Sequence, residues 1–170
     1  TKYLENKNSG DFTFCLYETE DETFTMNGSL VPKTANVSVK DGSGAYFFNL
    51  HYTSADKGYH YYVLEEAVPA VTNGILYDST EYHITVNVLD NGHGEMEAHV
   101  MSIVSDHISG KITATTLDFT NKYKATSTEY VIKGEKILNN KTLEADLFEF
   151  RLSNDEGEIT PSSYATVAGR

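Results

Sequence analysis

The sequence contains one cysteine, three prolines and no tryptophan in 170 residues. Because Cys15 is the only thiol, no disulfide can form within the chain, and an exported protein would need another source of robustness. Proline is scarce whereas Thr, Val, Tyr and Phe are frequent, which favours β-strands joined by Gly and Asn turns over helices. The composition therefore predicts an almost all-β protein.

Basic residues are also few, with 13 Lys and Arg against 25 Asp and Glu and a net charge of -12. This balance argues against nucleic-acid binding, which needs a basic surface, and against docking on anionic membranes. No run is apolar enough to span a membrane, and no basic-then-apolar leader opens the sequence. Since the first residues already resemble a strand, we expect the chain to be a piece of a longer protein.

Residues 58–66, with the sequence GYHYYVLEE, are predicted to form the central strand. Side chains alternate between the two faces of a strand, so Tyr59, Tyr61 and Val63 share one face with Glu65. A carboxylate at the end of an apolar stripe is costly to bury without a partner. We therefore predict that Glu65 faces inward as part of a polar cluster, and a β-bulge would instead turn Glu66 inward.

Two more polar side chains fall on predicted inward faces. Lys2 shares a face with Leu4 in the opening strand, and Asn121 shares one with Phe119 in the strand over residues 115–123. Taken alone, Lys2 could be a solvated side chain on a fraying strand, and Asn121 could cap a strand end. Together with Glu65 they make three inward polar groups of complementary chemistry.

The remaining strands alternate clearly. Residues 11–18 place Phe12, Phe14 and Leu16 inward, with Cys15 on the other, half-exposed face. Further strands are expected at 37–39, 45–50, 82–88 and 96–100. The inward positions predicted in the segment over residues 82–88 are Tyr82, Ile84, Val86 and Val88.

No metal site is expected. The acidic run over residues 18–22 is most simply a solvated loop, because its spacing matches no ligand pattern. The three histidines His83, His93 and His99 fall on outward positions and a turn, which favours solvated side chains over a metal cluster.

An internal repeat divides the chain. Residues 136–141 (KILNNK) followed by 147–152 (LFEFRL) echo residues 2–7 (KYLENK) followed by 11–16 (DFTFCL). We predict a first domain over residues 1–124, a polar linker over 125–129, and a second, incomplete copy over 130–170. A tandem array is implied, in which Lys136 takes the place of Lys2.

At this point the chain resembles the isopeptide-linked pilin domains of Gram-positive surface proteins, of the T-antigen-like and shaft-pilin type. The resemblance covers residues 1–124, and its order and spacing are more specific than any one segment. The matching segments are KYL at 2–4, FTF with Leu16 at 12–16, YHYYVLE at 59–65, GILYD at 74–78 leading to Tyr82, and FTNKY at 119–123.

The resemblance implies a Greek-key β-sandwich in which Lys2 and Asn121 condense into an amide, helped by Glu65. Burial agrees with this chemistry, because an ammonium with its usual pKa of about 10.4 cannot attack an amide whereas a desolvated amine can. An apolar setting also raises the pKa of Glu65, which could then hydrogen-bond the Asn121 carbonyl and shuttle protons. No cofactor is required. Lys136 would have no Glu or Asn partner within this chain.

The resemblance further implies a structural stalk or pilin module that lies outside the cell and is anchored to the cell wall through other regions. Its partners would be neighbouring repeats or pilin subunits, with a host ligand left open, and no nucleic acid or inserted membrane. Pilus shaft, pilus tip and single-chain adhesin stalk are not distinguished.

The alternative function is a carbohydrate- or calcium-binding β-sandwich, using outward tyrosines such as Tyr62 or the turn at residues 90–95. We expect no enzyme, since no nucleophile elbow, metal motif or phosphate loop is present.

Overall fold

The computed structural model describes residues 1–130, 132–142, 148, 153–154 and 157–158. The chain divides into two compact units, Thr1–Thr126 and Ser127–Arg170. The described residues are almost entirely strand, turn or extended chain, and include one short 3-10 helix, η1 (Ser54–Asp56). The predicted all-β class is confirmed. None of the helices in the described part of the chain is long and apolar enough to cross a membrane.

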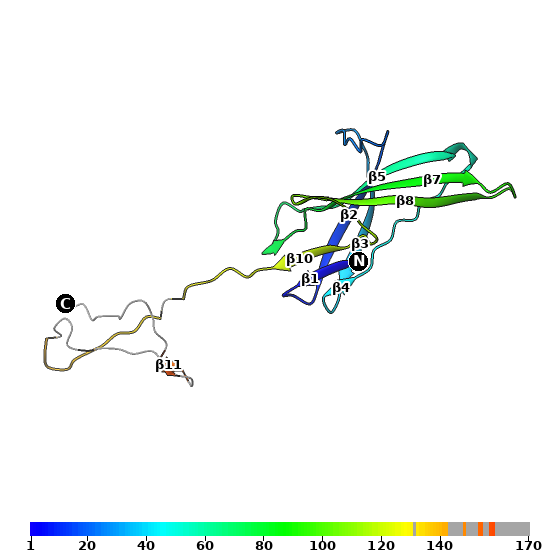
Figure 1. The fold of residues 1–170 in the computed structure, drawn as a ribbon. Helices are drawn as coiled ribbons and strands as arrows, with labels where there is room; N and C mark the ends of the chain where they lie inside the picture. The colour runs from blue at the N-terminus through cyan, green and yellow to red at the C-terminus, as the bar shows by residue number, and fades with distance from the viewer. Residues whose placement is uncertain (131, 143–147, 149–152, 155–156, 159–170) are drawn as a thin grey trace. The chain divides into compact units, whose positions relative to one another are not determined.

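The first unit contains two sheets (Figure 1). The larger sheet has six strands in the order β3-β2-β5-β7-β8-β9, and the smaller has four in the order β4-β1-β10-β6. The strands of the larger sheet are β2 (Gly10–Thr19), β3 (Lys33–Val39), β5 (Gly58–Glu66), β7 (Glu81–Asp90), β8 (Met96–His107) and β9 (Gly110–Thr113). Those of the smaller sheet are β1 (Lys2–Glu5), β4 (Ser43–Gly44), β6 (Ile75–Leu76) and β10 (Phe119–Tyr123).

The hydrophobic core lies between the two sheets. Leu4 of β1 and Phe119 of β10 supply it from the smaller sheet. The larger sheet contributes the alternating apolar positions that the sequence predicts for β2 and β7. These positions are Phe12, Phe14, Leu16, Tyr82, Ile84, Val86 and Val88, all of them buried.

The first and last strands of the unit are neighbours. β1 pairs with β10 in parallel, with Lys2 opposite Phe119 and Leu4 opposite Asn121. Residues two apart on a strand share a face, so Lys2 and Asn121 lie on the same side of the smaller sheet, diagonally across the pair. The fold thus brings together two side chains that are 119 positions apart in sequence.

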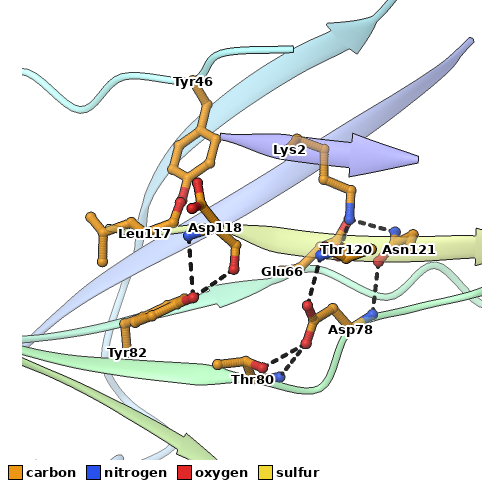
Figure 2. A network of polar contacts seen from close by, with 10 residues as sticks. All are labelled: Lys2, Tyr46, Glu66, Asp78, Thr80, Tyr82, Leu117, Asp118, Thr120 and Asn121. Atoms are coloured by element: carbon orange, nitrogen blue, oxygen red, sulfur yellow. Dashed lines mark hydrogen bonds and ion pairs between the residues drawn. The ribbon is translucent and has the colours of Figure 1, made fainter. Parts of the chain in front are cut away.

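Two tyrosines from other segments fix the chain just before β10. The Tyr46 hydroxyl donates to the Leu117 carbonyl oxygen at 2.6 Å. The Asp118 N–H donates to the Tyr82 hydroxyl oxygen at 3.2 Å. The Tyr82 bond ties the chain before β10 to β7 of the larger sheet, and the Tyr46 bond ties it to the extended segment over residues 45–50, so both help to set where Asn121 lies (Figure 2).

One predicted strand is absent as such. Residues 45–50 are extended but form no strand, although Tyr46 and Phe48 pack on the core as their alternation predicts. The chain has turned away from β1 after the two residues of β4, so this segment covers the core without joining a ladder. Apolar alternation records burial of one face and does not by itself require a strand partner.

The outer face of the larger sheet is less exposed than predicted. Cys15 is buried, although it lies on the face opposite the core. His83 is also buried, because the Phe24 ring stacks on its imidazole with centroids 4.5 Å apart and meets Tyr61 edge-on at 5.8 Å. The loop before β3 therefore covers part of this face, and the prediction of a solvated His83 is wrong.

Only part of the second unit is described. Its strands β11 (Ser153–Asn154) and β12 (Gly157–Glu158) form an antiparallel pair. The Lys136 ammonium lies 4.7 Å from the centroid of the Phe148 ring. The predicted repeat segment 147–152 lies outside the described residues except for Phe148.

Candidate functional site

The site consists of three polar side chains enclosed between the sheets, Lys2, Glu66 and Asn121 (Figure 2). Lys2 comes from β1 and Asn121 from β10, while Glu66 ends β5 in the opposite sheet. The Lys2 and Glu66 side chains are both 0% exposed, and so is Asn121. Burying three such groups without partners would cost several kcal/mol, so their mutual contacts are what the fold must provide.

Glu66 contacts both of its partners at once. Its Oε2 lies 2.9 Å from the Lys2 Nζ, and its Oε1 accepts a hydrogen bond of 2.9 Å from the Asn121 Nδ2. One carboxyl group therefore bridges an amine and a side-chain amide. This is the arrangement that a proton transfer between the two nitrogens requires.

The structure brings Lys2 and Asn121 together as the sequence predicts, but it does not bring Glu65 to them. Glu65 pairs with Cys15 across the β2–β5 ladder, and it points to the outer face. The predicted inward placement of Glu65 is wrong. Glu66 occupies the position, paired with Phe14 in the same ladder.

A bulge does not cause this difference. The ladders of β5 with β2 and with β7 run without a break in register. The error lies in the phase of the whole strand, since Tyr62 and Leu64 join the core with Glu66, while Tyr59, Tyr61 and Val63 lie on the other face. Val63 is itself fully buried, so both faces of β5 are apolar at this end and hydrophobicity does not reveal the phase.

The environment of the site favours neutral forms of its two ionisable groups. Desolvation lowers the pKa of Lys2 below its usual value, although Glu66 and Asp78 oppose this. Desolvation raises the pKa of Glu66, against the contacts with Lys2 and Asn121. The lysine Nζ also lies 4.8 Å from the Phe12 ring centroid, in an aromatic setting. A proton can thus pass between the lysine and the glutamate at little cost.

Asp78 is a fourth participant that the sequence did not single out. Its backbone N–H donates to the Asn121 Oδ1 at 2.7 Å. Because a backbone N–H can only donate, this bond fixes which end of the Asn121 amide is oxygen, and it leaves the Nδ2 facing Glu66. The Asp78-Ser79-Thr80 sequence is typical of an Asx turn, which was the available sequence signal for a fixed backbone here.

The two alternative sites, for sugar at Tyr62 and for calcium in the turn over residues 90–95, have side chains that already bond within the protein. Tyr62, proposed as an outward sugar-stacking residue, is buried and its hydroxyl bonds with that of Tyr52 at 2.9 Å. In the turn after β7, Asp90 and Asn91 accept hydrogen bonds from the backbone N–H groups of Gly92 and His93. Among the residues that the structure describes, no group of three or more His, Cys, Asp and Glu could hold a metal ion.

Comparison with known proteins identifies the family of the chain. The sequence model of the family described as "FctA: Spy0128-like isopeptide containing domain" matches residues 1–124. The chain therefore belongs to this family, and the predicted family is confirmed. No curated protein sequence matches the chain.

Solved structures of the major pilin from Streptococcus pyogenes resemble the chain. A glutamate-to-alanine variant of that pilin is 20% identical with a TM-score of 0.52, over 98% of this chain and 69% of the pilin. The unsubstituted pilin is 25% identical with a TM-score of 0.48, and an asparagine-to-alanine variant is 22% identical with a TM-score of 0.49. Those two alignments each cover 72% of this chain and 48% of the pilin, so the chain spans about half of that pilin's length. The first of these likenesses supports the β-sandwich fold.

Proposed function

We propose that this member of the isopeptide-containing family is a load-bearing structural module that cross-links itself through an amide between the Lys2 Nζ and the Asn121 Cγ. The observation that carries the proposal is the buried contact of Glu66 with both side chains, each at 2.9 Å. Glu66, rather than Glu65, is the proposed acid and base.

The first step is formation of the nucleophile. An ammonium has no lone pair, so Lys2 must give a proton to the Glu66 carboxylate before it reacts. The pKa of Lys2 is lowered and that of Glu66 is raised by the same burial, which favours this transfer. Folding itself activates the lysine and places it beside the amide, so no cofactor is involved.

The second step exchanges one amide for another. The neutral Lys2 Nζ attacks the Asn121 Cγ, and the carbonyl electron pair moves onto the Oδ1. Glu66 gives its proton to the Nδ2 and takes one from the Nζ, after which the C–N bond breaks and ammonia leaves. Glu66 ends as a neutral carboxyl, as its buried position favours.

The proposed bond would transmit a pulling force between the two ends of the unit without loading the rest of the fold. Lys2 is the second residue of the unit and Asn121 lies in its last strand, so a force applied to the two ends would run through the amide. Without the bond, the same force would shear the parallel β1 and β10 strands apart. With it, the residues between positions 2 and 121 lie outside the path of the force.

This mechanical role indicates where the module works. A pilus or a surface stalk needs units that do not extend, and the similar solved structures are those of a major pilin. We infer that the chain is part of a Gram-positive surface protein, outside the cell and attached through other regions, with neighbouring repeats or pilin subunits as partners. The reaction occurs once per molecule, so the module is not an enzyme.

The second unit is proposed to begin another copy of the same domain. Lys136 lies 4.7 Å from the Phe148 ring centroid, as Lys2 lies 4.8 Å from that of Phe12. Asn140 has a φ of 65°, and Asn6, at the equivalent place in the repeat, has a φ of 62°. These features support the predicted division into a domain over 1–124, a linker over 125–129 and a second copy over 130–170.

Intact mass spectrometry of the folded chain tests the proposal. The wild-type mass should be short by one ammonia, whereas Lys2→Ala and Asn121→Ala chains should have their full masses. Lys7→Ala is the matched control, because Lys7 is exposed, and it should still lose ammonia. A full wild-type mass would overturn the proposed cross-link.

A further inference from the structure

The Asn121 carbonyl oxygen is the atom that must gain negative charge when the lysine attacks. In the structure this Oδ1 accepts the backbone N–H of Asp78 at 2.7 Å. Donors at about 2.7–3.1 Å from a developing oxyanion stabilise it strongly in a site without water. Asn121 is fully buried, so the N–H has no competing solvent partner on that oxygen.

The Asp78 side chain fixes the backbone that carries this N–H. Its Oδ1 accepts from the Thr80 N–H at 3.0 Å and from the Thr80 hydroxyl at 2.6 Å. Its Oδ2 accepts from the Thr120 N–H at 2.7 Å. One carboxylate thus closes its own turn and also attaches that turn to β10, one residue before Asn121 (Figure 2).

We propose that the Asp78 backbone N–H is the oxyanion donor of the cross-linking reaction, and that the Asp78 carboxylate is the residue that positions it. This inference rests on the proposed function, because it assigns a further role in the same reaction. Glu66 handles protons on the nitrogens, while the Asp78 N–H stabilises the oxygen, so the two act on different atoms of one amide.

The tetrahedral intermediate shows why both are needed. As the Nζ–Cγ bond forms, the carbonyl electron pair moves to the Oδ1, which would be an unsolvated alkoxide between the sheets without a donor. The Asp78 N–H is already in place and needs no reorganisation. When the Cγ–Nδ2 bond breaks, the electron pair returns to form the new carbonyl, and the product amide keeps the same hydrogen bond.

Replacing the backbone N–H of Asp78 by an ester oxygen removes the donor and keeps the Asp78 side chain. The full chain would be made with the corresponding hydroxy acid and kept in denaturant, so that it starts without the bond. Intact mass would then follow the release of ammonia as the chain refolds. Loss of one oxyanion donor should slow ammonia release by about a hundredfold or more. The matched control is the same replacement at Ile75, whose N–H donates to the Thr72 carbonyl at 2.9 Å in the same segment.

Asp78→Ala tests the positioning role with an ordinary substitution. It should also slow the reaction at its optimum pH, and because the Asp78 charge raises the pKa of both Lys2 and Glu66, both limbs of the rate-against-pH profile should move to lower pH. Circular dichroism and hydrogen exchange would show that the β1–β10 pair is formed in each variant, so that slow folding is not mistaken for slow chemistry.

The outcomes separate this inference from the proposed function. If the wild-type chain never loses ammonia, the proposed function fails, and the inference fails with it. If the wild-type and the Ile75 ester react normally and the Asp78 ester reacts as fast as they do, the inference alone is overturned. A slow Asp78 ester beside a normal Ile75 ester would support it.

Discussion

The two neighbouring carboxyls of β5 occupy opposite faces of the larger sheet and have opposite surroundings. Glu66 lies between the sheets against Lys2 and Asn121. Glu65 lies on the outer face, where its neighbours include Tyr17, Cys15 and Glu81. Desolvation raises the pKa of both carboxyls. A raised pKa therefore does not by itself single out the proposed acid and base, whereas the contacts of Glu66 with Lys2 and Asn121 do.

The largest expected effect comes from exchanging each carboxyl for an amide. Glu66→Gln should slow cross-linking by about a hundredfold to ten-thousandfold, because a positioned acid and base is lost. Glu65→Gln, one residue away, should react like the wild-type chain. Intact mass during refolding measures both rates. Equal rates for the two variants, or a slower Glu65 variant, would contradict the assignment of Glu66 as the acid and base.

The next effect concerns stability. The bond would close a loop of nearly the whole unit, which in the chain-entropy account of such cross-links stabilises the fold by about 5 kcal/mol. Asn121→Ala should lose at least this much, because it also removes a partner of Glu66. Denaturant unfolding of the variant and of the exposed-site control Asn49→Ala measures the difference. A loss no larger than that of the control would contradict the cross-link.

The pH dependence of cross-linking should be bell-shaped. The pKa of Lys2 is lowered and that of Glu66 is raised, so the reactive form with one shared proton exists between them. At low pH the lysine is protonated beside a neutral carboxyl and cannot attack, and at high pH the carboxyl loses the proton it must give to the leaving nitrogen. Refolding rates across the pH range check this. A rate that rises without limit as pH increases would exclude Glu66 as the acid.

The smallest effect is expected on the outer face. Burial beneath Phe24 lowers the pKa of His83, with Lys111 adding to this and Asp106 and Glu81 opposing it. The folded state then binds fewer protons than the unfolded state below about pH 6.5, so the free energy of unfolding should fall as the pH falls through this range. The contribution of His83 is measured by denaturant unfolding at several pH values of two chains, the Asn121→Ala variant and the same variant that also carries His83→Gln. If the free energy of unfolding changes with pH by the same amount in both chains, His83 is not the cause of the acid destabilisation.

Strands with one apolar face were predictable from the sequence, and strands with two were not. In β2, β7 and β10 apolar residues alternate with polar ones, which indicated the inward positions of Phe14, Ile84 and Asn121. In β5 the outer residue Val63 is as buried as the core residue Leu64, so the alternation that would have separated Glu65 from Glu66 is missing. The second face is apolar because the sheet is covered there as well.

The lysine and asparagine of the site were predictable because each stands among apolar residues of its own strand. The role of Asp78 was not, since it depends on a backbone N–H whose direction is set by a turn and by the pairing of that turn with β10. A sequence pattern records which side chains share a face. It does not record where a particular peptide group points.

The most direct test of the account is to locate the bond. Protease digestion of the wild-type chain, followed by fragment mass spectrometry, should yield one branched peptide that joins Lys2 to Asn121 and lacks one ammonia. The same peptide should be absent from Lys2→Ala. Recovery of two separate linear peptides, with Lys2 and Asn121 unmodified, would contradict the account.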